Sequence, residues 1–107
     1  MEYIDIEKDL IPYRFEIPLS DAVFTLEIHY NSEYDFFTVD IEREGAVLVT
    51  GYKMVYGVPL FAGCVDDRLP MEEIIPYDES GIHQQVTWET LGETVFLYVF
   101  AGDSDGE

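Results

Sequence analysis

Hydrophobic and polar residues alternate along most of this chain, and the alternation predicts β-strands. In residues 37–42 the apolar positions fall at every second residue: Phe37, Val39 and Ile41. A period of two is typical of a strand that buries one face and exposes the other to water. Glu44 and Gly45 then supply a turn, and residues 47–49 begin a second apolar, β-branched run. We therefore predict a β-hairpin, around which the rest of the chain is organised.

The N-terminal third shows the same alternation twice more, in residues 13–19 and in residues 24–30. A short turn at residues 20–22 joins them into a second hairpin. Pro18 places the first of these strands at a sheet edge, because proline has no N–H to donate to a neighbouring strand. Residues 1–10 place apolar side chains among acids, a pattern that admits a short strand or a helical turn, and we favour a strand or an extended arm.

Glycine and proline interrupt the pattern after the central hairpin. Gly51 lies inside a strand pattern, where glycine marks a bulge or a close backbone approach. Pro59 cannot occupy a central ladder, so residues 58–61 should run along an edge or leave the sheet. A loop is predicted for residues 62–71 from its glycine, proline and aspartate content.

Three further segments complete the C-terminal half. A strand begins at Ile74 and Ile75, a clear turn follows at residues 78–81, and residues 82–88 form a polar strand candidate. Residues 95–100 are continuously apolar, which predicts a central strand buried on both faces.

These segments give about seven strands joined mostly by short links, with little helix. The fold class predicted is all-β, a small antiparallel sandwich or a partly open barrel. We expect one β domain over residues 1–100 and a flexible acidic tail over residues 101–107, which has no apolar anchor.

Charge limits the classes of partner. The chain has 23 acidic and 5 basic residues among 107, a net charge of −18. Phosphate binding requires clustered lysine and arginine, so neither nucleic acid nor an anionic membrane surface is an expected partner. The acidic surface is explained by solubility or by docking to a basic partner. The single Cys64 excludes an internal disulfide, and we find no signal peptide or spanning segment, so we expect a soluble chain made in a cytoplasm.

Chemical motifs are weak. His29 and His83 are far apart and lack ligand spacing, so we predict no metal site. The segment GDSDG near the C-terminus resembles part of a calcium loop but lacks its distal glutamate. Paired acids such as Asp66 and Asp67 lie in loops, where acids usually form turns. We predict no catalytic residues, no cofactor and no enzymatic activity.

Aromatic residues near predicted loops are the best candidates for contacts with another protein, because aromatic side chains dominate interface energetics. Together with the proline of the edge segment, the predicted partner-binding residues are Tyr52, Tyr56, Pro59, Tyr77 and Trp88.

Several segments resemble one known family, the small baseplate plugs of contractile-tailed bacteriophages and related prophages. They are IPYRFEI at 11–17, LEIHYN at 26–31, FTVDI at 37–41, LVTGYKMVYGVPLF at 48–61 and LGETVFLYV at 91–99. The most specific part is the order of Gly51, Met54, Val55, Gly57, Pro59 and Leu60, followed by Leu91 and Gly92 before an apolar strand. The resemblance implies a non-enzymatic all-β structural protein at the junction of tail tube, hub and spike.

The partners so implied are tail-tube, hub or spike proteins, with a homo-oligomer in the assembly also open. The implied location is the virion tail baseplate, reached from the host bacterial cytoplasm. Two alternatives come from the residues alone. One is a small β module that binds a carbohydrate or other small ligand in a groove lined by Tyr52, Tyr77 and Trp88. The other is a hydrolase that uses two loop carboxylates.

Overall fold

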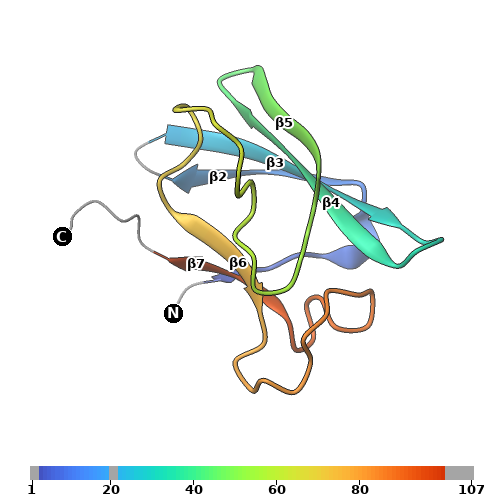
Figure 1. Ribbon diagram of the computed structural model, residues 1–107. Coiled ribbons are helices and arrows are strands. Elements are labelled where there is room, and N and C mark those ends of the chain that lie inside the picture. Colours follow the sequence, from blue (N-terminus) through green and yellow to red (C-terminus); the bar gives the residue numbers. More distant parts are fainter. Residues whose placement is uncertain (1–2, 20–21, 101–107) are drawn as a thin grey trace.

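The computed structural model describes residues 3–19 and 22–100, and it shows two β-sheets on either side of a common core (Figure 1). These residues form seven strands and one short 3-10 helix. In chain order they are β1 (Tyr3–Ile4), η1 (Lys8–Leu10), β2 (Tyr13–Leu19), β3 (Ala22–Asn31), β4 (Phe36–Arg43), β5 (Ala46–Lys53), β6 (Glu73–Tyr77) and β7 (Phe96–Phe100). The two antiparallel sheets do not close into a barrel, so the all-β prediction is confirmed in its sandwich form.

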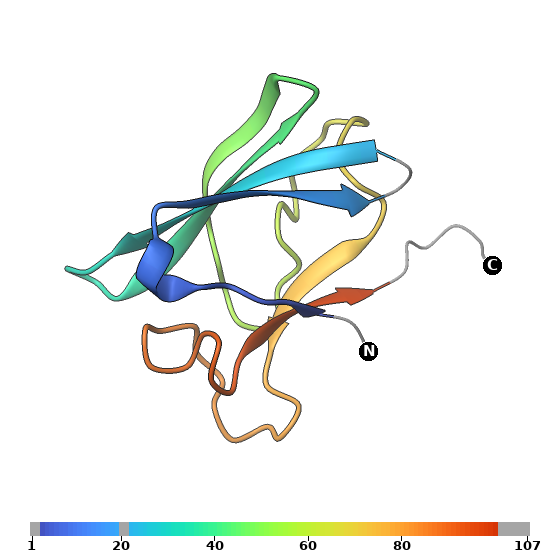
Figure 2. The same ribbon diagram turned by 180° about the vertical axis from the view of Figure 1, so that it is seen from behind.

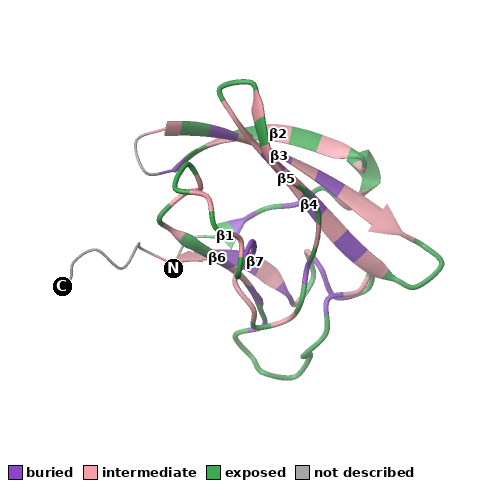
Figure 3. Cartoon of the chain, turned by 45° about the horizontal axis from the view of Figure 1, so that its top comes forward, coloured by how far each residue is buried: buried purple, intermediate pink, exposed green. Residues whose placement is uncertain are grey.

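The larger sheet has the order β2-β3-β4-β5, and every strand is antiparallel to its neighbours. Both predicted hairpins are confirmed, and β2, which contains Pro18, lies at an edge. Figure 3 shows buried and less buried residues alternating along these strands. The inward side chains at the centre of the sheet have no exposed surface: Phe24, Leu26, Ile28, Phe37, Val39 and Ile41.

The β4–β5 turn uses two residues with positive φ, Glu44 at 53° and Gly45 at 82°. Two consecutive positive φ values match the twist of a two-residue hairpin turn. Further along β5, its pairing register with β4 shifts on both sides of the β4 residue Ile41. The Gly51 N–H of β5 donates to Oδ1 of Asp40 at 2.7 Å. The predicted irregularity at Gly51 is therefore a β-bulge.

The smaller sheet has the order β1-β7-β6, again antiparallel (Figure 2). The prediction that the last apolar strand is central is confirmed, since β7 lies between the other two. The N-terminal strand is also present, but it is short: Tyr3 pairs with Tyr98 and Ile4 pairs with Leu97. Ile4, Ile74 and Leu97 face the larger sheet and are buried.

The chain between β5 and β6 leaves the larger sheet and runs beside β6, as predicted for the segment that contains Pro59. The Gly57 N–H donates to the carbonyl of Pro76 at 2.8 Å, and the Leu60 N–H donates to the carbonyl of Ile74 at 2.8 Å. These two bonds occupy part of the outer edge of β6. The predicted loop over residues 62–71 is confirmed.

The strand predicted over residues 82–88 is wrong. Side chains satisfy backbone groups there that a strand would pair in a ladder. The Asp78 carboxylate accepts the N–H of His83 at 2.9 Å, while Thr90 Oγ1 accepts the N–H of Thr87 at 2.9 Å and donates to the carbonyl of Gln85 at 2.8 Å. These contacts fold the segment into successive turns.

In the described residues, no helix has the length and apolar character needed to cross a membrane. The predicted tail at 101–107 lies outside the described residues. So do Ser20 and Asp21 of the predicted turn at 20–22, whereas Ala22 begins β3.

Candidate functional site

The predicted partner-binding residues fall into three separate groups. The first group is Tyr52 and Pro59. The Tyr52 ring packs against Phe61 with centroids 5.3 Å apart, and its hydroxyl donates to the carbonyls of Pro59 and Ala62, both at 3.4 Å. Tyr52 therefore fixes the loop after β5 against the larger sheet.

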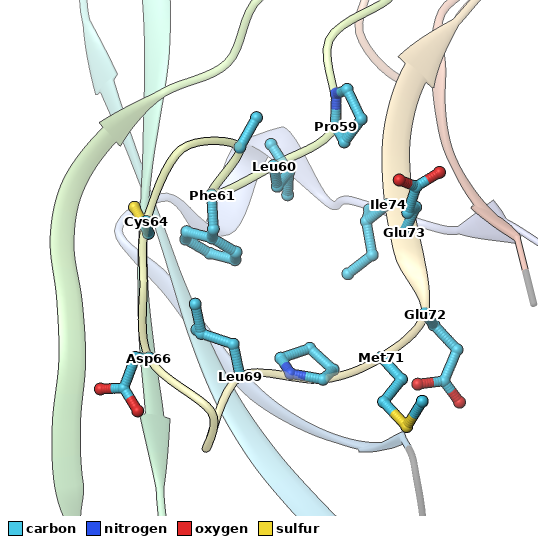
Figure 4. Close-up of a pocket in the computed structure, with 12 residues that line it drawn as sticks. Pro59, Leu60, Phe61, Cys64, Asp66, Leu69, Met71, Glu72, Glu73 and Ile74 are labelled. Carbon is cyan, nitrogen blue, oxygen red and sulfur yellow. The ribbon is translucent and has the colours of Figure 1, made fainter. Parts of the chain in front are cut away.

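Pro59 borders a hollow of about 340 Å³ between this loop and β6. The hollow has an apolar wall, and Figure 4 shows four side chains pointing into it: Leu60, Phe61, Leu69 and Ile74. The carboxylates of Asp66 and Glu72 point away from it in the same view. The Asp66 carboxylate is paired with Arg68, so the hollow itself offers mainly apolar contacts.

Tyr56 and Tyr77 form the second group. Their rings stack with centroids 5.7 Å apart. The Tyr56 hydroxyl accepts the N–H of Asp78 at 3.1 Å, which positions the turn after β6. Tyr77 is 42% exposed and lies on the outer side of the smaller sheet.

Trp88 stands apart from both groups, at the end of the larger sheet. Its ring packs against Tyr30 at 4.8 Å and is nearly parallel to Phe37 at 6.1 Å. The Lys8 ammonium lies 5.2 Å from the centre of the Trp88 ring and donates to the Trp88 carbonyl, while the Trp88 N–H donates to Oδ1 of Asp35 at 2.9 Å. Tyr52, Tyr77 and Trp88 thus belong to different ring clusters.

A cluster of aromatic rings lies on the outer side of the smaller sheet, and of its members only Tyr77 was among the predicted contact residues. Tyr3, Phe96 and Tyr98 contact one another at centroid distances of 4.6 to 6.3 Å, and Tyr77 adjoins Tyr98 at 6.4 Å. The signal was present as Phe96, Tyr98 and Phe100 at alternate positions of one strand. Its neighbour Tyr3 was not predictable, because it is brought there by pairing between distant parts of the chain.

A group of metal-ligating side chains also appears that residue spacing did not predict. His29 Nε2 lies 3.0 Å from Oε2 of Glu27 and 3.5 Å from Oδ2 of Asp40, so these three ligand atoms converge on the outer side of β3 and β4. The arrangement depends on the cross-strand pairing of Glu27 with Asp40. Solvent-accessible acidic groups such as these are common without a metal.

Asp78 is buried and strongly hydrogen-bonded. The Ser80 hydroxyl donates to Oδ1 at 2.6 Å, the Ser80 N–H donates to the same oxygen at 2.8 Å, and the His83 N–H donates to Oδ2 at 2.9 Å. These donors, the Ser80 hydroxyl first, lower the pKa of Asp78 to about 2. The carboxylate therefore stays ionised and organises the turn.

All five basic residues of the chain are engaged within it. Arg14 bonds to Glu42 and Glu27, and Arg68 bonds to Asp66. The other three lie over aromatic rings: Lys8 over Trp88, Arg43 over Phe24 and Lys53 over Phe36. With 23 acidic residues against these five basic ones, the chain carries a large excess of negative charge.

Comparison with known families gives a match over nearly the whole chain. The model of the family described as Cyanophage baseplate Pam3 plug gp18 matches residues 1–102. The matched region includes all the strands of both sheets that the structure describes. No curated protein matches the chain.

Proposed function

The chain belongs to the family of cyanophage baseplate plugs typified by Pam3 gp18, and on this basis we propose that it is a plug at the junction of the tail tube, the central hub and the spike. The family supports a structural role in a virion tail baseplate, which is consistent with a protein that is not an enzyme. The observation that carries the proposal is the extent of the match, from residue 1 to residue 102.

The proposed partners are tail-tube, hub or spike proteins, met during assembly in the host bacterial cytoplasm. Two features of the chain support contacts of this kind. It has 23 acidic and only 5 basic residues, and such an excess of negative charge suits a basic partner. The side chains at the proposed contact positions are exposed or half-buried, and all but the proline are aromatic: Tyr52, Tyr56, Pro59, Tyr77 and Trp88.

The test is co-purification from cells that express the chain, with an affinity tag, together with the neighbouring tail genes. We expect mass spectrometry to identify tail-tube, hub or spike proteins in the eluate. Their recovery should fall at high salt, because screening weakens attraction between charged surfaces. Recovery of no tail protein from a folded, monomeric chain would refute the proposal and favour the ligand-binding alternative.

The proposed contact residues are tested in the same assay. Tyr56→Phe keeps the ring and removes the bond to the Asp78 N–H, whereas Tyr56→Ala also removes the stack on Tyr77. Tyr34→Ala is the matched control, because Tyr34 is 73% exposed and belongs to none of the proposed contacts. Unchanged recovery with alanine at Tyr52, Tyr56, Tyr77 and Trp88, each checked for a normal melting curve, would exclude these side chains as anchors.

A further inference from the structure

The smaller sheet has two apolar sides, although only one of them faces the core. Side chains alternate along its strands, so one set points towards the larger sheet and the other points outward. The outward positions of β1, β6 and β7 are almost all aromatic or aliphatic: Tyr3, Ile75, Tyr77, Phe96, Tyr98 and Phe100. We call this set the aromatic face. Glu73 is the single charged residue among the outward strand positions of this sheet, within the described residues.

The rings of the aromatic face form one continuous surface. Tyr3 and Tyr77 stand on either side of Tyr98, at centroid distances of 5.8 and 6.4 Å, and Phe96 contacts Tyr3 at 4.6 Å. Tyr98 is only 6% exposed and forms the floor, whereas Tyr3 is 50% exposed and Tyr77 is 42% exposed. Contiguous exposed apolar surface of this kind marks interaction sites in soluble proteins.

The larger sheet provides an internal comparison. Its outward positions carry charged and polar side chains, including Arg14, Glu27, His29, Asp40 and Glu42. The outer surface of the larger sheet is therefore polar, whereas the outer surface of the smaller sheet is largely apolar. The continuous apolar sequence of β7 is the pattern of a strand covered on both sides. Among the described residues, its inward Leu97 is fully buried, whereas its outward Phe96 and Phe100 are only half-buried.

The charges around the aromatic face indicate what covers it. Glu73 lies on the face, and the carboxylate of Glu79 lies close enough to the Tyr98 hydroxyl to contribute, after burial, to raising its pKa. A second copy of this chain docked through the same face would place acids against acids. A surface with arginine would instead pair with these acids and stack its guanidinium groups on the tyrosine rings.

We propose that the aromatic face docks onto a different protein of the baseplate or tail, whose contacting surface carries arginine side chains around an apolar centre. This inference rests on the proposed function and adds the face used and the chemistry of the partner. Docking buries the outward side chains of β7 that the described residues leave half-buried.

The test uses the full-length chain in the co-purification assay. Tyr3→Ser with Phe96→Ser removes two rings from the face, and Tyr34→Ser with Val47→Ser removes two exposed apolar side chains elsewhere as the matched control. We expect the face variant to reduce recovery of tail proteins at least tenfold and the control to leave it unchanged. Fluorescence of Trp88, which packs on the larger sheet, verifies that each variant is folded.

A charge variant tests the chemistry of the partner independently of packing. Glu73 is exposed, so Glu73→Lys leaves the core intact, and we expect it to reduce recovery severalfold, with Glu73→Gln intermediate. Unchanged or higher recovery with Glu73→Lys would overturn the arginine-bearing partner. Normal recovery with the folded face variant would overturn the docking face while leaving the plug function standing, whereas loss of all tail proteins from the wild-type chain would overturn the plug function. A wild-type homodimer in sedimentation analysis that the face variant abolishes would overturn a heterologous partner in favour of a second copy.

Discussion

Replacing Phe37 should show most clearly how much the core, as opposed to the surface, contributes to the stability of this protein. The Phe37 side chain has no exposed surface, and it lies between Tyr30, with centroids 4.8 Å apart, and Trp88, at 6.1 Å. Truncating a fully buried phenylalanine to alanine costs about 3–5 kcal/mol in the free energy of unfolding, because transfer energy is lost and a cavity remains. The total stability expected of a domain of this size is about 5–15 kcal/mol, so Phe37→Ala should remove a large part of it.

The assay is urea unfolding followed by the fluorescence of Trp88, the only tryptophan in the chain. With a slope of about 2 kcal/mol per M, a loss of about 4 kcal/mol lowers the urea midpoint by about 2 M. Native-state emission should also shift to longer wavelength, since the Trp88 ring loses its parallel neighbour. Phe37→Leu is the control, and it should cost less than about 1.5 kcal/mol because it keeps most of the volume. A loss below about 1.5 kcal/mol for Phe37→Ala, with unchanged emission, would refute the packing described for this cluster.

Three further predictions follow from the turns and the charges. The pKa of Asp78 is about 2, below its usual 3.8, so the contribution of this carboxylate to stability is complete above pH 4 and is lost as the pH falls through about 2. The amide NMR signal of Ser80 should therefore titrate with a midpoint near 2. A midpoint near 4 would contradict the hydrogen bonds described for Asp78. Glu44 has a φ of 53°, which asparagine adopts more readily than glutamate, so Glu44→Asn should raise the free energy of unfolding by about 0.5 kcal/mol in urea titrations; a lower urea midpoint would argue against the turn geometry. The net charge of −18 makes the acidic side chains repel one another, and salt screens this repulsion. Raising sodium chloride from 0.01 M to 0.15 M shortens the Debye length from about 30 Å to about 8 Å and should therefore raise the melting temperature. A lower melting temperature would show that the Arg14 and Arg68 ion pairs, which salt also screens, outweigh the repulsion among the acids.

The larger sheet was predictable because its strands obey local rules. Alternation in residues 24–30 and 37–42 identifies the inner side chains, and the hairpin turns fix which strands are neighbours. The turn at Glu44 and Gly45 follows from the conformational freedom of glycine. Pro18 and Pro59 were informative for the same kind of reason, since each lacks an N–H.

The remaining features depend on contacts that spacing does not encode. A polar, weakly alternating sequence suggested a strand over residues 82–88, but the side chains of Asp78 and Thr90 bind the backbone and fold it into turns. The aromatic face requires Tyr3 to lie opposite Tyr98, and the convergence of His29 with its carboxylates requires the β3–β4 register. Which residues pair across such long sequence separations depends on the whole fold.

The strand order of the smaller sheet also imposes an order on folding. β2 to β5 pair with sequence neighbours, whereas β1 must find β7 near the other end of the described chain. Closing so long a loop costs about 3 kcal/mol more in chain entropy than closing a hairpin, and only two residue pairs reward it. The larger sheet should therefore form first, with β1 joining last. The aromatic rings of β7 would then gain their neighbour Tyr3 only at the final step of folding. A chain in which β1 has not yet paired would present an incomplete aromatic face, and its incorporation into an assembly would be disfavoured.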